Sequence, residues 1–373
     1  MEPRDDAGVS DIAPHGSAAA SQPPAPKLRA VAAGSFYGAA AAAAMRPAGA
    51  PAAALHDPDA PGAFVLSAAG DTRFKPPAAA AVVLDPCISA RLRPHQREGV
   101  AFLYECVMGL RGAHTGCLLC DDMGLGKTLQ VVALLWTLLK QSPAGGGAVP
   151  AVRRALVVCP ASLVATWRSE VRKWLGPARL GMAAIGGGPK ARAAFAAWAA
   201  RGQTAQPLCI TSYETLRACA AEAAAAAPGL LVCDEGHRLK SATGSKTLEA
   251  LRALGAAKRV ILSGCDLLAS RRLRCCAASE PLRPRSTPVQ NNLEEFYSLV
   301  EFVAPGALGE RAAFRRGVAA PIEAARDADA SPAAQRAGAA AAAALADKAR
   351  AWLLRRTAEV NYKCVRKTNS SAA

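Results

Sequence analysis

The sequence is poor in aromatic residues and lacks any long uncharged apolar run. Only 5% of its 373 residues are aromatic although 51% are hydrophobic, so alanine supplies much of the apolar count. We therefore expect the core-forming segments to be concentrated in part of the chain. No stretch of about 18 apolar residues free of charge occurs, which excludes an ordinary membrane-spanning helix and argues against a membrane partner.

Signals of secretion and of a disulfide framework are also missing. Met1–Asp6 is acidic and leads into no apolar stretch, unlike a secretory or transit peptide. The 12 cysteines have irregular spacing, which favours free, mostly buried thiols in a reducing compartment. Cys117 and Cys120 have a spacing that zinc sites also use, but no second pair stands at metal-ligand distance and both fall in a predicted buried strand.

Acidic residues are in the minority. The chain has 45 Lys and Arg against 29 Asp and Glu, a formal net charge of +16. This favours a polyanionic partner, nucleic acid before an anionic membrane, but a net charge does not identify a site. No cluster of five to eight basic residues marks a nuclear-localisation signal.

From about Val82, short apolar runs alternate with amphipathic stretches of ten or more residues, the pattern of βαβ units and a parallel sheet. The predicted strands are Cys117–Cys120, Ala155–Cys159, Leu208–Thr211, Leu230–Cys233 and Arg259–Ser263. The predicted helices include Thr128–Lys140, Ser162–Leu175 and Thr247–Leu254, with a weak helix in 218–228 and a surface loop in 141–150. Trp167 and Trp174 recur at helical spacing, which core packing explains.

A glycine-containing loop joins the first predicted strand to an amphipathic helix. It consists of Asp121, Asp122, Met123, Gly124, Leu125, Gly126, Lys127 and Thr128. Strand, loop and helix in this order predict a phosphate-binding loop, whose glycines turn N–H groups toward phosphate oxygens at a helix N-terminus. Lys127 would reach the β- and γ-phosphates and Thr128 would offer its hydroxyl to Mg²⁺. The strict pattern has glycine at position 121, and a Gly-Lys-Thr turn also occurs by chance.

An acidic pair ends the fourth predicted strand. Asp234 and Glu235 follow Leu230–Cys233, about 105 residues after the loop. The carboxyl end of a parallel strand beside a phosphate loop is where Mg²⁺ is held. We assign Asp234 to the metal and Glu235 to polarising the attacking water as a general base. The alternative is a strand followed by an ordinary charged turn.

With these motifs the sequence resembles the first motor lobe of the Snf-type DNA translocases of helicase superfamily two. The resemblance rests on Asp121–Thr128 and on Asp-Glu-Gly-His at 234–237. Leu92–Val100 and Cys233–Lys240 resemble in particular the Rad-fifty-four branch of recombinational-repair translocases. Further blocks are Ala54–Pro58, Ser212–Thr215, Asn292–Val300 and Leu354–Thr357, so that the resemblance covers about residues 54–361.

The resemblance implies a fold, ligands and partners. It implies an α/β, RecA-like lobe that uses ATP and Mg²⁺ and translocates on double-stranded DNA in homologous recombination and double-strand break repair. A recombinase filament as partner and a nuclear location follow from it as well. It also implies that Gln96 contacts adenine, with Arg93 and His95 shaping the entrance to that pocket. Without the resemblance, Gln96 and His95 could simply face solvent on a helix.

Further residues receive roles from the resemblance alone. Ser162 and Thr211 would face the DNA backbone, where small hydroxyl and N–H groups position the duplex without reading its sequence. His237 and Lys240 would link the nucleotide site to the DNA. Without the resemblance, Ser162 could be only the N-cap of its helix.

One motif of the resembled family is split in this sequence. The Ser-Gly-Thr-Pro segment that senses the γ-phosphate is separated into Ser263-Gly264 and Thr287-Pro288 by the 22 residues 265–286. Closing such a loop costs only about a few kcal/mol, so the fold could survive it. Ser263 and Thr287 must sit together for coupling, and we interpret 265–286 as unspliced or wrongly predicted sequence.

We therefore divide the chain into a disordered tail (1–54), an N-terminal extension (55–90), an ATP-binding lobe (91–361) and an unrelated tail (362–373). A second motor lobe is not found. That lobe would supply arginine fingers, which are worth about 10³ to 10⁵ in rate, so we expect weak ATP binding and poor hydrolysis. The alternatives are a catalytically weak ATP- or DNA-binding fragment and a chromatin-remodelling ATPase of the same family, although no histone-reading domain or acidic tail is seen.

Overall fold

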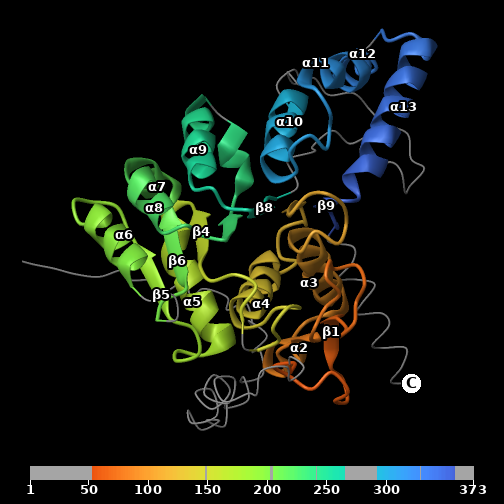
Figure 1. The fold of residues 1–373 in the computed structure, drawn as a ribbon. Helices are drawn as coiled ribbons and strands as arrows, with labels where there is room; N and C mark the ends of the chain where they lie inside the picture. The colour runs from red at the N-terminus through yellow and green to blue at the C-terminus, as the bar shows by residue number, and fades with distance from the viewer. Residues whose placement is uncertain are drawn as a thin grey trace, which may run out of the picture.

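A parallel β-sheet forms the centre of the chain (Figure 1). The computed structural model describes residues 53–147, 149–201, 205–240, 242–264, 292–327 and 329–357. Its main sheet has seven strands in the order β5-β6-β4-β7-β8-β3-β9, all paired in parallel. These strands are β3 (Gly116–Leu119), β4 (Ala155–Cys159), β5 (Met182–Ile185), β6 (Leu208–Ser212), β7 (Leu230–Cys233), β8 (Lys258–Leu262) and β9 (Leu353–Leu354). The expected α/β class is confirmed.

The five predicted strands lie within one residue of their expected bounds, and two further strands of this sheet, β5 and β9, are not predicted by the sequence. β5 is rich in alanine and β9 has only two residues, so neither produces a run of large apolar side chains. β9 nevertheless extends along the phosphate-loop strand, because Cys120 N donates to Leu354 O at 2.7 Å and Asp122 N donates to Arg356 O at 2.9 Å.

Helices cover both faces of the sheet. They are α2 (Pro86–Ser89), α3 (Pro94–Val107), α4 (Lys127–Lys140), α5 (Val164–Leu175), α6 (Ala191–Ala200), α7 (Tyr213–Ala218), α8 (Ala220–Ala225), α9 (Ala242–Ala253) and α10 (Asn292–Val303), with 3-10 turns η1 (Ala161–Leu163) and η2 (Gly236–Lys240). Strand residues alternate between two cores: Cys117 and Leu119 pack with α3, α4 and α5, whereas Leu118 packs with the helices from α6 onward. Among the described helices, none is long and apolar enough to cross a membrane.

The cysteines behave as the irregular spacing predicts. Each cysteine in the described ranges is a free thiol, and all of them except Cys87 are buried. Burial raises the pKa of Cys117 well above its ordinary value, so this thiol is unreactive. No group of three potential metal ligands occurs among His, Cys, Asp and Glu side chains in the described ranges.

The N-terminal extension packs against α4. It contains an antiparallel hairpin of β1 (Phe64–Ser67) and β2 (Val82–Leu84), followed by α2. The buried Asp85 carboxylate accepts from Trp136 Nε1 at 2.9 Å and from Arg179. Gln141 bonds both backbone groups of Val83, and its side chain is 1% exposed. The loop 141–150 therefore begins in the interior, contrary to the expectation of a surface loop, because it completes the edge of β2.

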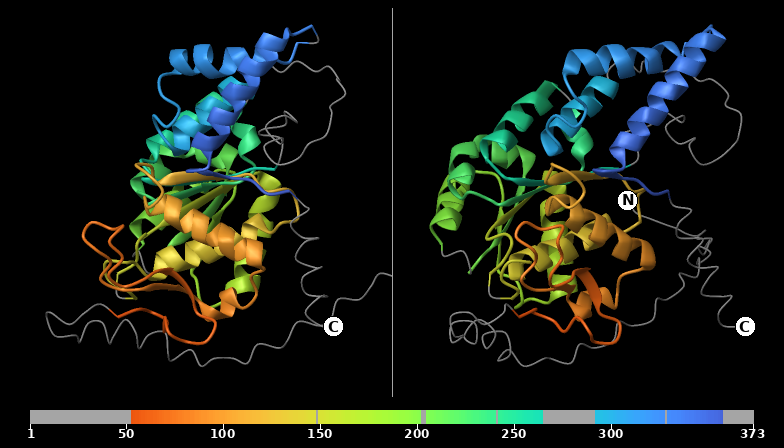
Figure 2. Two further views of the ribbon diagram at one scale, coloured as in Figure 1. Left: turned by 90° about the vertical axis from the view of Figure 1, so that its right-hand side faces the viewer. Right: turned by 45° about the vertical axis from the view of Figure 1, so that its right-hand side comes forward.

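Beyond the sheet, a helical arm projects from the molecule (Figures 1 and 2). It consists of α10, α11 (Arg311–Phe314), the π-helical η4 (Arg315–Ala319), α12 (Ala320–Ala324) and α13 (Pro332–Ala349), after which the chain returns as β9. Residues 265–291 and 358–373 lie outside the described part. The expectations for 265–286, Thr287 and 362–373 therefore stay predictions.

The root of the arm packs on the sheet without space for a side chain at Gly116. A Cβ atom there would lie 2.2 Å from Val303 O, at the end of α10, and 2.8 Å from Arg259 O. Because both contacts are backbone atoms, we predict that Gly116→Ala lowers the free energy of unfolding by about 1–3 kcal/mol. Urea denaturation of the 373-residue chain measures this. Gly317→Ala is the matched control, since a Cβ there meets nothing within 4 Å; an equal loss in both variants would contradict the prediction.

Candidate functional site

The loop between β3 and α4 has the backbone geometry of a phosphate cradle. Gly124 and Gly126 have φ angles of +81° and +77°, in the left-handed region that side-chain-bearing residues rarely adopt. Gly126 is the N-cap of α4, and no side chain caps this helix. The first N–H groups of a 14-residue helix therefore lack a side-chain acceptor at the point where the loop ends, which suits an anion.

Lys127 folds back over the loop. Its Nζ donates to the carbonyl oxygens of Asp121 at 2.8 Å and of Asp122 at 3.3 Å. The ammonium group therefore lies at the mouth of the loop on two neutral acceptors, which phosphate oxygens can replace. Thr128, next in α4, is partly exposed, and Met123 at the loop tip is 83% exposed.

The carbonyl of Leu125 is the point at which the rest of the protein holds the loop. Gln96 Nε2 donates to it at 3.2 Å, Gln130 Nε2 at 3.5 Å, and His95 Nε2 lies 3.2 Å away. His95 and Gln96 are buried, so the solvent-facing alternative is wrong for both. Desolvation lowers the pKa of His95, which keeps its ring neutral beside the loop.

Gln96 and Arg93 lie at the start of α3, against the loop. Gln96 Oε1 accepts from Arg93 N at 3.0 Å and closes a capping box, while the Arg93 side chain is exposed. A Cβ atom on Gly126 would lie 2.2 Å from Gln96 Nε2, so glycine is required here for packing as well as for backbone geometry. Each polar group of a carboxamide can make a second hydrogen bond, which leaves Gln96 able to contact a base.

A buried ion pair joins the loop to the chain after β9. Arg356 Nε donates to Asp121 Oδ1 at 3.0 Å, and its Nη2 pairs with Oδ2; Asp121 is fully buried. Arg356 also donates to Gln130 Oε1 at 2.8 Å and to the carbonyl of His95. Asp121 therefore takes part in the site through its carbonyl, which faces Lys127, while its carboxylate fixes the base of the loop. The sequence marked Arg356 only as part of a matching block.

Asp234 is a partly buried carboxylate at the carboxyl end of β7. Its Oδ2 accepts from Trp167 Nε1 at 2.7 Å and its Oδ1 from Glu235 N at 2.9 Å. Burial raises the pKa of Asp234, although these hydrogen bonds and the charge of Lys127 oppose the shift. Because the surrounding groups only partly compensate the negative charge of this carboxylate, Asp234 is suited to bind a cation. The helical spacing of Trp167 predicts core packing only. The structure adds that its indole N–H is bonded to Asp234.

Glu235 has an unusual backbone conformation. Its φ angle is +52°, one of two positive values among the described non-glycine residues. Strain of this kind clusters at functional sites. His237 Nδ1 lies 3.2 Å from Glu235 Oε2, and both side chains are partly exposed. The structure thus brings together Glu235, His237 and Asp234, as the motif predicts.

Of the two residues expected to face DNA, Ser162 is exposed and Thr211 is buried. Ser162 is exposed in η1 and caps no helix, since the N-caps of η1 and α5 are Pro160 and Leu163. The expectation for Thr211 is wrong: it is fully buried, and its hydroxyl donates to Ile185 O at 2.8 Å. Thr211 lies within the interior strand β6, which ends at Ser212, so its side chain serves the sheet.

Three further coupling residues are described to different extents. Ser263 follows β8 and is buried, its N–H donates to Leu119 O, and its hydroxyl has no partner among the described residues. Lys240 ends η2, but its side chain lies outside the described part, as does all of Thr287. Their coupling roles remain predictions.

Comparison with protein families gives one match. The family model described as SNF2-related domain matches residues 95–270 and 285–370, which is more than half of the chain. The chain belongs to the SNF2-related family. Membership implies a nucleotide-binding domain. Residues 271–284, left between the matched stretches, lie inside the segment interpreted as an insertion, and the match runs past 361 to residue 370.

Curated relatives are identical to this SNF2-related chain at about two-fifths of the aligned positions. The DNA repair protein rhp54 of Schizosaccharomyces pombe is 42% identical over 289 residues, covering 76% of this chain and 31% of that protein. The DNA repair and recombination protein RAD54-like is 40% identical over 329 residues in Gallus gallus and 39% over 330 residues in Homo sapiens, each covering 83% of this chain and 40% of the relative. The chain therefore spans 31% to 40% of the length of these relatives.

Solved structures of SNF2 proteins are also similar. The Sulfolobus solfataricus SWI2/SNF2 ATPase core in complex with dsDNA matches with a TM-score of 0.49 and 22% identity, over 71% of this chain and 44% of that chain. A second structure, the Sulfolobus solfataricus SWI2/SNF2 ATPase core domain, matches with a TM-score of 0.47.

Arg356 and Asp121 provide a stability test. Removing one partner of a buried ion pair leaves the other charge uncompensated, so Arg356→Met should lower the free energy of unfolding by about 3–5 kcal/mol. Combining it with Asp121→Asn should restore part of the loss. Arg350→Met is the control, because that arginine pairs with Asp347 on the surface and should cost at most about 1 kcal/mol. Equal effects of Arg356→Met and Arg350→Met in urea denaturation would contradict the assignment.

The raised pKa of Asp234 predicts a pH dependence with a definite sign. Because ionised Asp234 is disfavoured in the folded state, it lowers stability above its folded pKa, and this effect disappears as pH falls toward the unfolded value of 3.8. The stability of the wild type relative to Asp234→Asn should therefore rise as pH falls from 7 to 4. Urea denaturation across this range measures the difference; a difference that shrinks on acidification would contradict the cause assigned to the shift.

Proposed function

We propose that this chain is the first motor lobe of an ATP-dependent double-stranded DNA translocase that acts in homologous recombination and double-strand break repair. The single observation that carries the proposal is the placement of the phosphate loop and the Asp234–Glu235 pair on one edge of the sheet. They follow β3 and β7, with β8 between them. The names of the relatives, DNA repair and recombination proteins, support the biological role.

ATP fits the loop through charge and backbone donors. Gly124 and Gly126 leave the loop open, the N-terminus of α4 adds its N–H groups, and Lys127 can transfer its hydrogen bonds from carbonyl oxygens to phosphate oxygens. A charge-assisted bond is stronger than a bond to a neutral carbonyl, so the exchange favours binding. Gln96 would contact adenine from the start of α3, with Arg93 beside it.

Mg²⁺ suits the oxygen donors of this edge. Thr128 offers a hydroxyl and Asp234 a partly buried carboxylate, and nucleotide-bound Mg²⁺ takes one or two protein oxygens together with phosphates and water. The hydrogen bonds from Trp167 and Glu235 N fix the orientation of the Asp234 carboxylate. When bound, the ion neutralises charge on the phosphates.

Glu235 is the proposed general base. It follows β7 with a strained backbone, its side chain is 34% exposed, and His237 Nδ1 lies 3.2 Å from its carboxylate. In this position Glu235 can accept a proton from water that attacks the γ-phosphate, and His237 holds the carboxylate in place. His237 and Lys240 lie in the same 3-10 turn and would couple this carboxylate to the DNA-binding surface.

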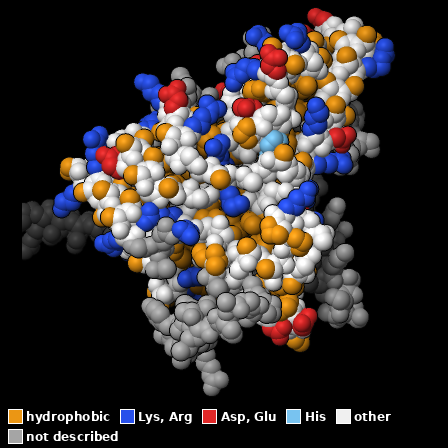
Figure 3. Space-filling view, viewed as in Figure 1, with side chains coloured by type: hydrophobic (Ala, Val, Ile, Leu, Met, Phe, Trp, Pro, Cys, Tyr) orange, Lys and Arg blue, Asp and Glu red, His pale blue; other side chains and the backbone are white. Residues whose placement is uncertain are grey.

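Double-stranded DNA is the proposed track. Ser162 is exposed on η1, which directly follows β4 at the same carboxyl edge of the sheet as Asp234. Lys and Arg side chains are spread over the face seen in Figure 3, and the net charge of +16 favours phosphate contacts. A recombinase filament as partner and a nuclear location are proposed from the relatives' role in recombination.

Lys127→Ala tests the nucleotide site. Loss of a charge-assisted bond to phosphate should weaken binding of a fluorescent ATP analogue in the presence of Mg²⁺ by about 10- to 100-fold, corresponding to about 1.5–3 kcal/mol. Arg336→Ala, which removes an exposed cation of the arm, is the matched control and should leave the affinity unchanged. Equal affinities of Lys127→Ala and wild type would overturn the assignment.

Glu235→Gln separates hydrolysis from binding. The glutamine keeps the size of the side chain but cannot accept the proton, so the rate of ATP hydrolysis should fall by about 10²- to 10⁴-fold while analogue binding stays intact. Rates are measured with and without duplex DNA on the 373-residue chain. Hydrolysis at the wild-type rate by this variant would show that Glu235 is not the base.

A further inference from the structure

The outer edge of β5 has no neighbouring strand in the described part of the chain. β5 is the terminal strand of the sheet and pairs with β6 on its inner side. The Thr211 hydroxyl on β6 donates to Ile185 O, so this carbonyl points into the sheet. Because successive residues of a strand direct their N–H and C=O groups to opposite sides, those of Met182 and Ala184 point outward. Such an edge is a template for a further strand.

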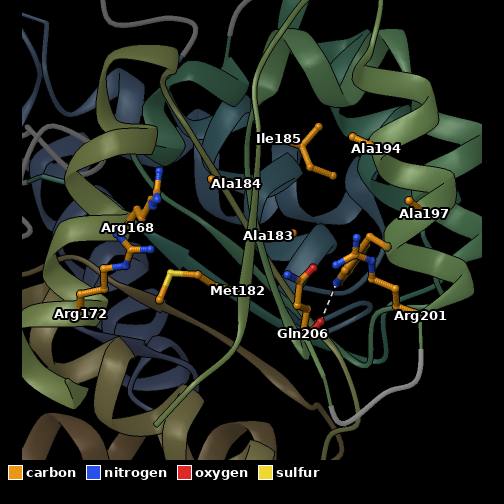
Figure 4. A pocket seen from close by; sticks show the side chains of 11 residues that line it. Arg168, Arg172, Met182, Ala183, Ala184, Ile185, Ala194, Ala197, Arg201 and Gln206 are labelled. Atoms are coloured by element: carbon orange, nitrogen blue, oxygen red, sulfur yellow. Dashed lines mark hydrogen bonds between the residues drawn. The ribbon is translucent and has the colours of Figure 1, made fainter. Parts of the chain in front are cut away.

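A groove of about 370 Å³ runs along this edge (Figure 4). Met182 and Ala184 line it on the side of α5, and Trp198 lines it on the side of α6. The indole of Trp198 is held in place, since its Nε1 donates to Gln206 O at 2.8 Å. The groove thus combines a wall fixed by the buried indole of Trp198 with the outward backbone groups of β5.

Three arginines surround the groove. Arg168 and Arg172, four residues apart on α5, lie on one side of β5, and Arg201, after α6, lies on the other (Figure 4). All three are exposed, and within the described ranges none of their guanidinium groups makes an ion pair or hydrogen bond. No carboxylate lines the groove. It is therefore a positively charged surface on both faces of an open strand.

We propose that the β5 edge binds an extended acidic segment of a partner protein, which adds to the sheet as an eighth strand. Neighbouring side chains of a strand point to opposite faces. Consecutive carboxylates of the added strand would therefore reach Arg168 and Arg172 on one face and Arg201 on the other. Backbone bonds to Met182 and Ala184 would supply affinity, as in strand addition generally. DNA phosphates could use the arginines and the outward N–H groups but not the outward carbonyl oxygens, which need a donor such as the N–H groups of another strand, and for this reason a peptide is favoured.

The probe is fluorescein-labelled Val-Glu-Glu-Val-Glu-Glu-Val with blocked ends, titrated with the 373-residue chain by anisotropy. We expect saturable binding that a peptide with Lys in place of Glu does not show. Ala184→Pro removes an outward N–H at an edge position where proline is tolerated, and it should weaken binding at least tenfold without lowering the melting temperature. Unchanged binding by Ala184→Pro would overturn the proposal.

The arginines are tested by charge reversal. The triple variant Arg168→Glu, Arg172→Glu and Arg201→Glu should weaken binding at least tenfold. The control Arg315→Glu, Arg316→Glu and Arg336→Glu makes the same change in net charge on exposed arm residues and should have little effect. Equal losses of peptide affinity in both triple variants would show that the binding depends only on the net charge of the protein, and this would overturn the proposed site.

Two further measurements decide the remaining cases. If Ala184→Pro lowers the melting temperature, the proline is placed in the peptide instead. Replacing the three valines of the peptide by proline removes N–H groups in both strand registers and keeps all four carboxylates. Binding of this peptide should be lost. A DNA duplex that binds the groove through the three arginines, with peptide binding insensitive to proline on either side, would make the groove a phosphate surface and refute strand addition.

Discussion

The buried ion pair between Arg356 and Asp121 is the interaction on which the nucleotide loop depends. Charges withdrawn from water are stable only when they are paired and hydrogen-bonded, and here the guanidinium satisfies that condition with groups from three elements. It bonds Asp121 at the base of the loop, Gln130 on α4 and the carbonyl of His95 on α3. The side chains of His95 and Gln130 then meet at the carbonyl of Leu125. The loop is therefore held from below by one network, while its upper surface, with Lys127, remains available to phosphate.

Local motifs in the sequence predict the chemistry of this site well. Gly124 and Gly126 have the positive φ angles that the loop requires, and Asp234 and Glu235 follow a strand whose bounds match the prediction. Such features depend on a few consecutive residues, whose spacing and conformational limits can be read directly. The five strands made of large apolar side chains are predictable for a similar reason, because they are buried on both faces.

What the sequence hides are contacts between distant residues. Arg356 and Asp121 are 235 positions apart, and β9 has only two residues, too few to show a period. Trp167 has the spacing of a core residue, and only the structure shows that its indole N–H orients Asp234. For Thr211 the sequence predicts a contact with DNA, whereas in the structure its hydroxyl donates to a carbonyl oxygen of the neighbouring strand. In each case a single long-range polar contact decides the role, and residue type does not reveal it.

The path of the chain through the arm has a structural consequence. The chain leaves the sheet after β8 and returns to it as β9, and these two strands are the immediate neighbours of β3 on either side. The described strands before and after the arm are therefore both hydrogen-bonded to the strand that leads into the phosphate loop. At the C-terminal end of the arm this connection is direct, because β9 pairs with β3 and Arg356 then bonds Asp121 at the base of the loop.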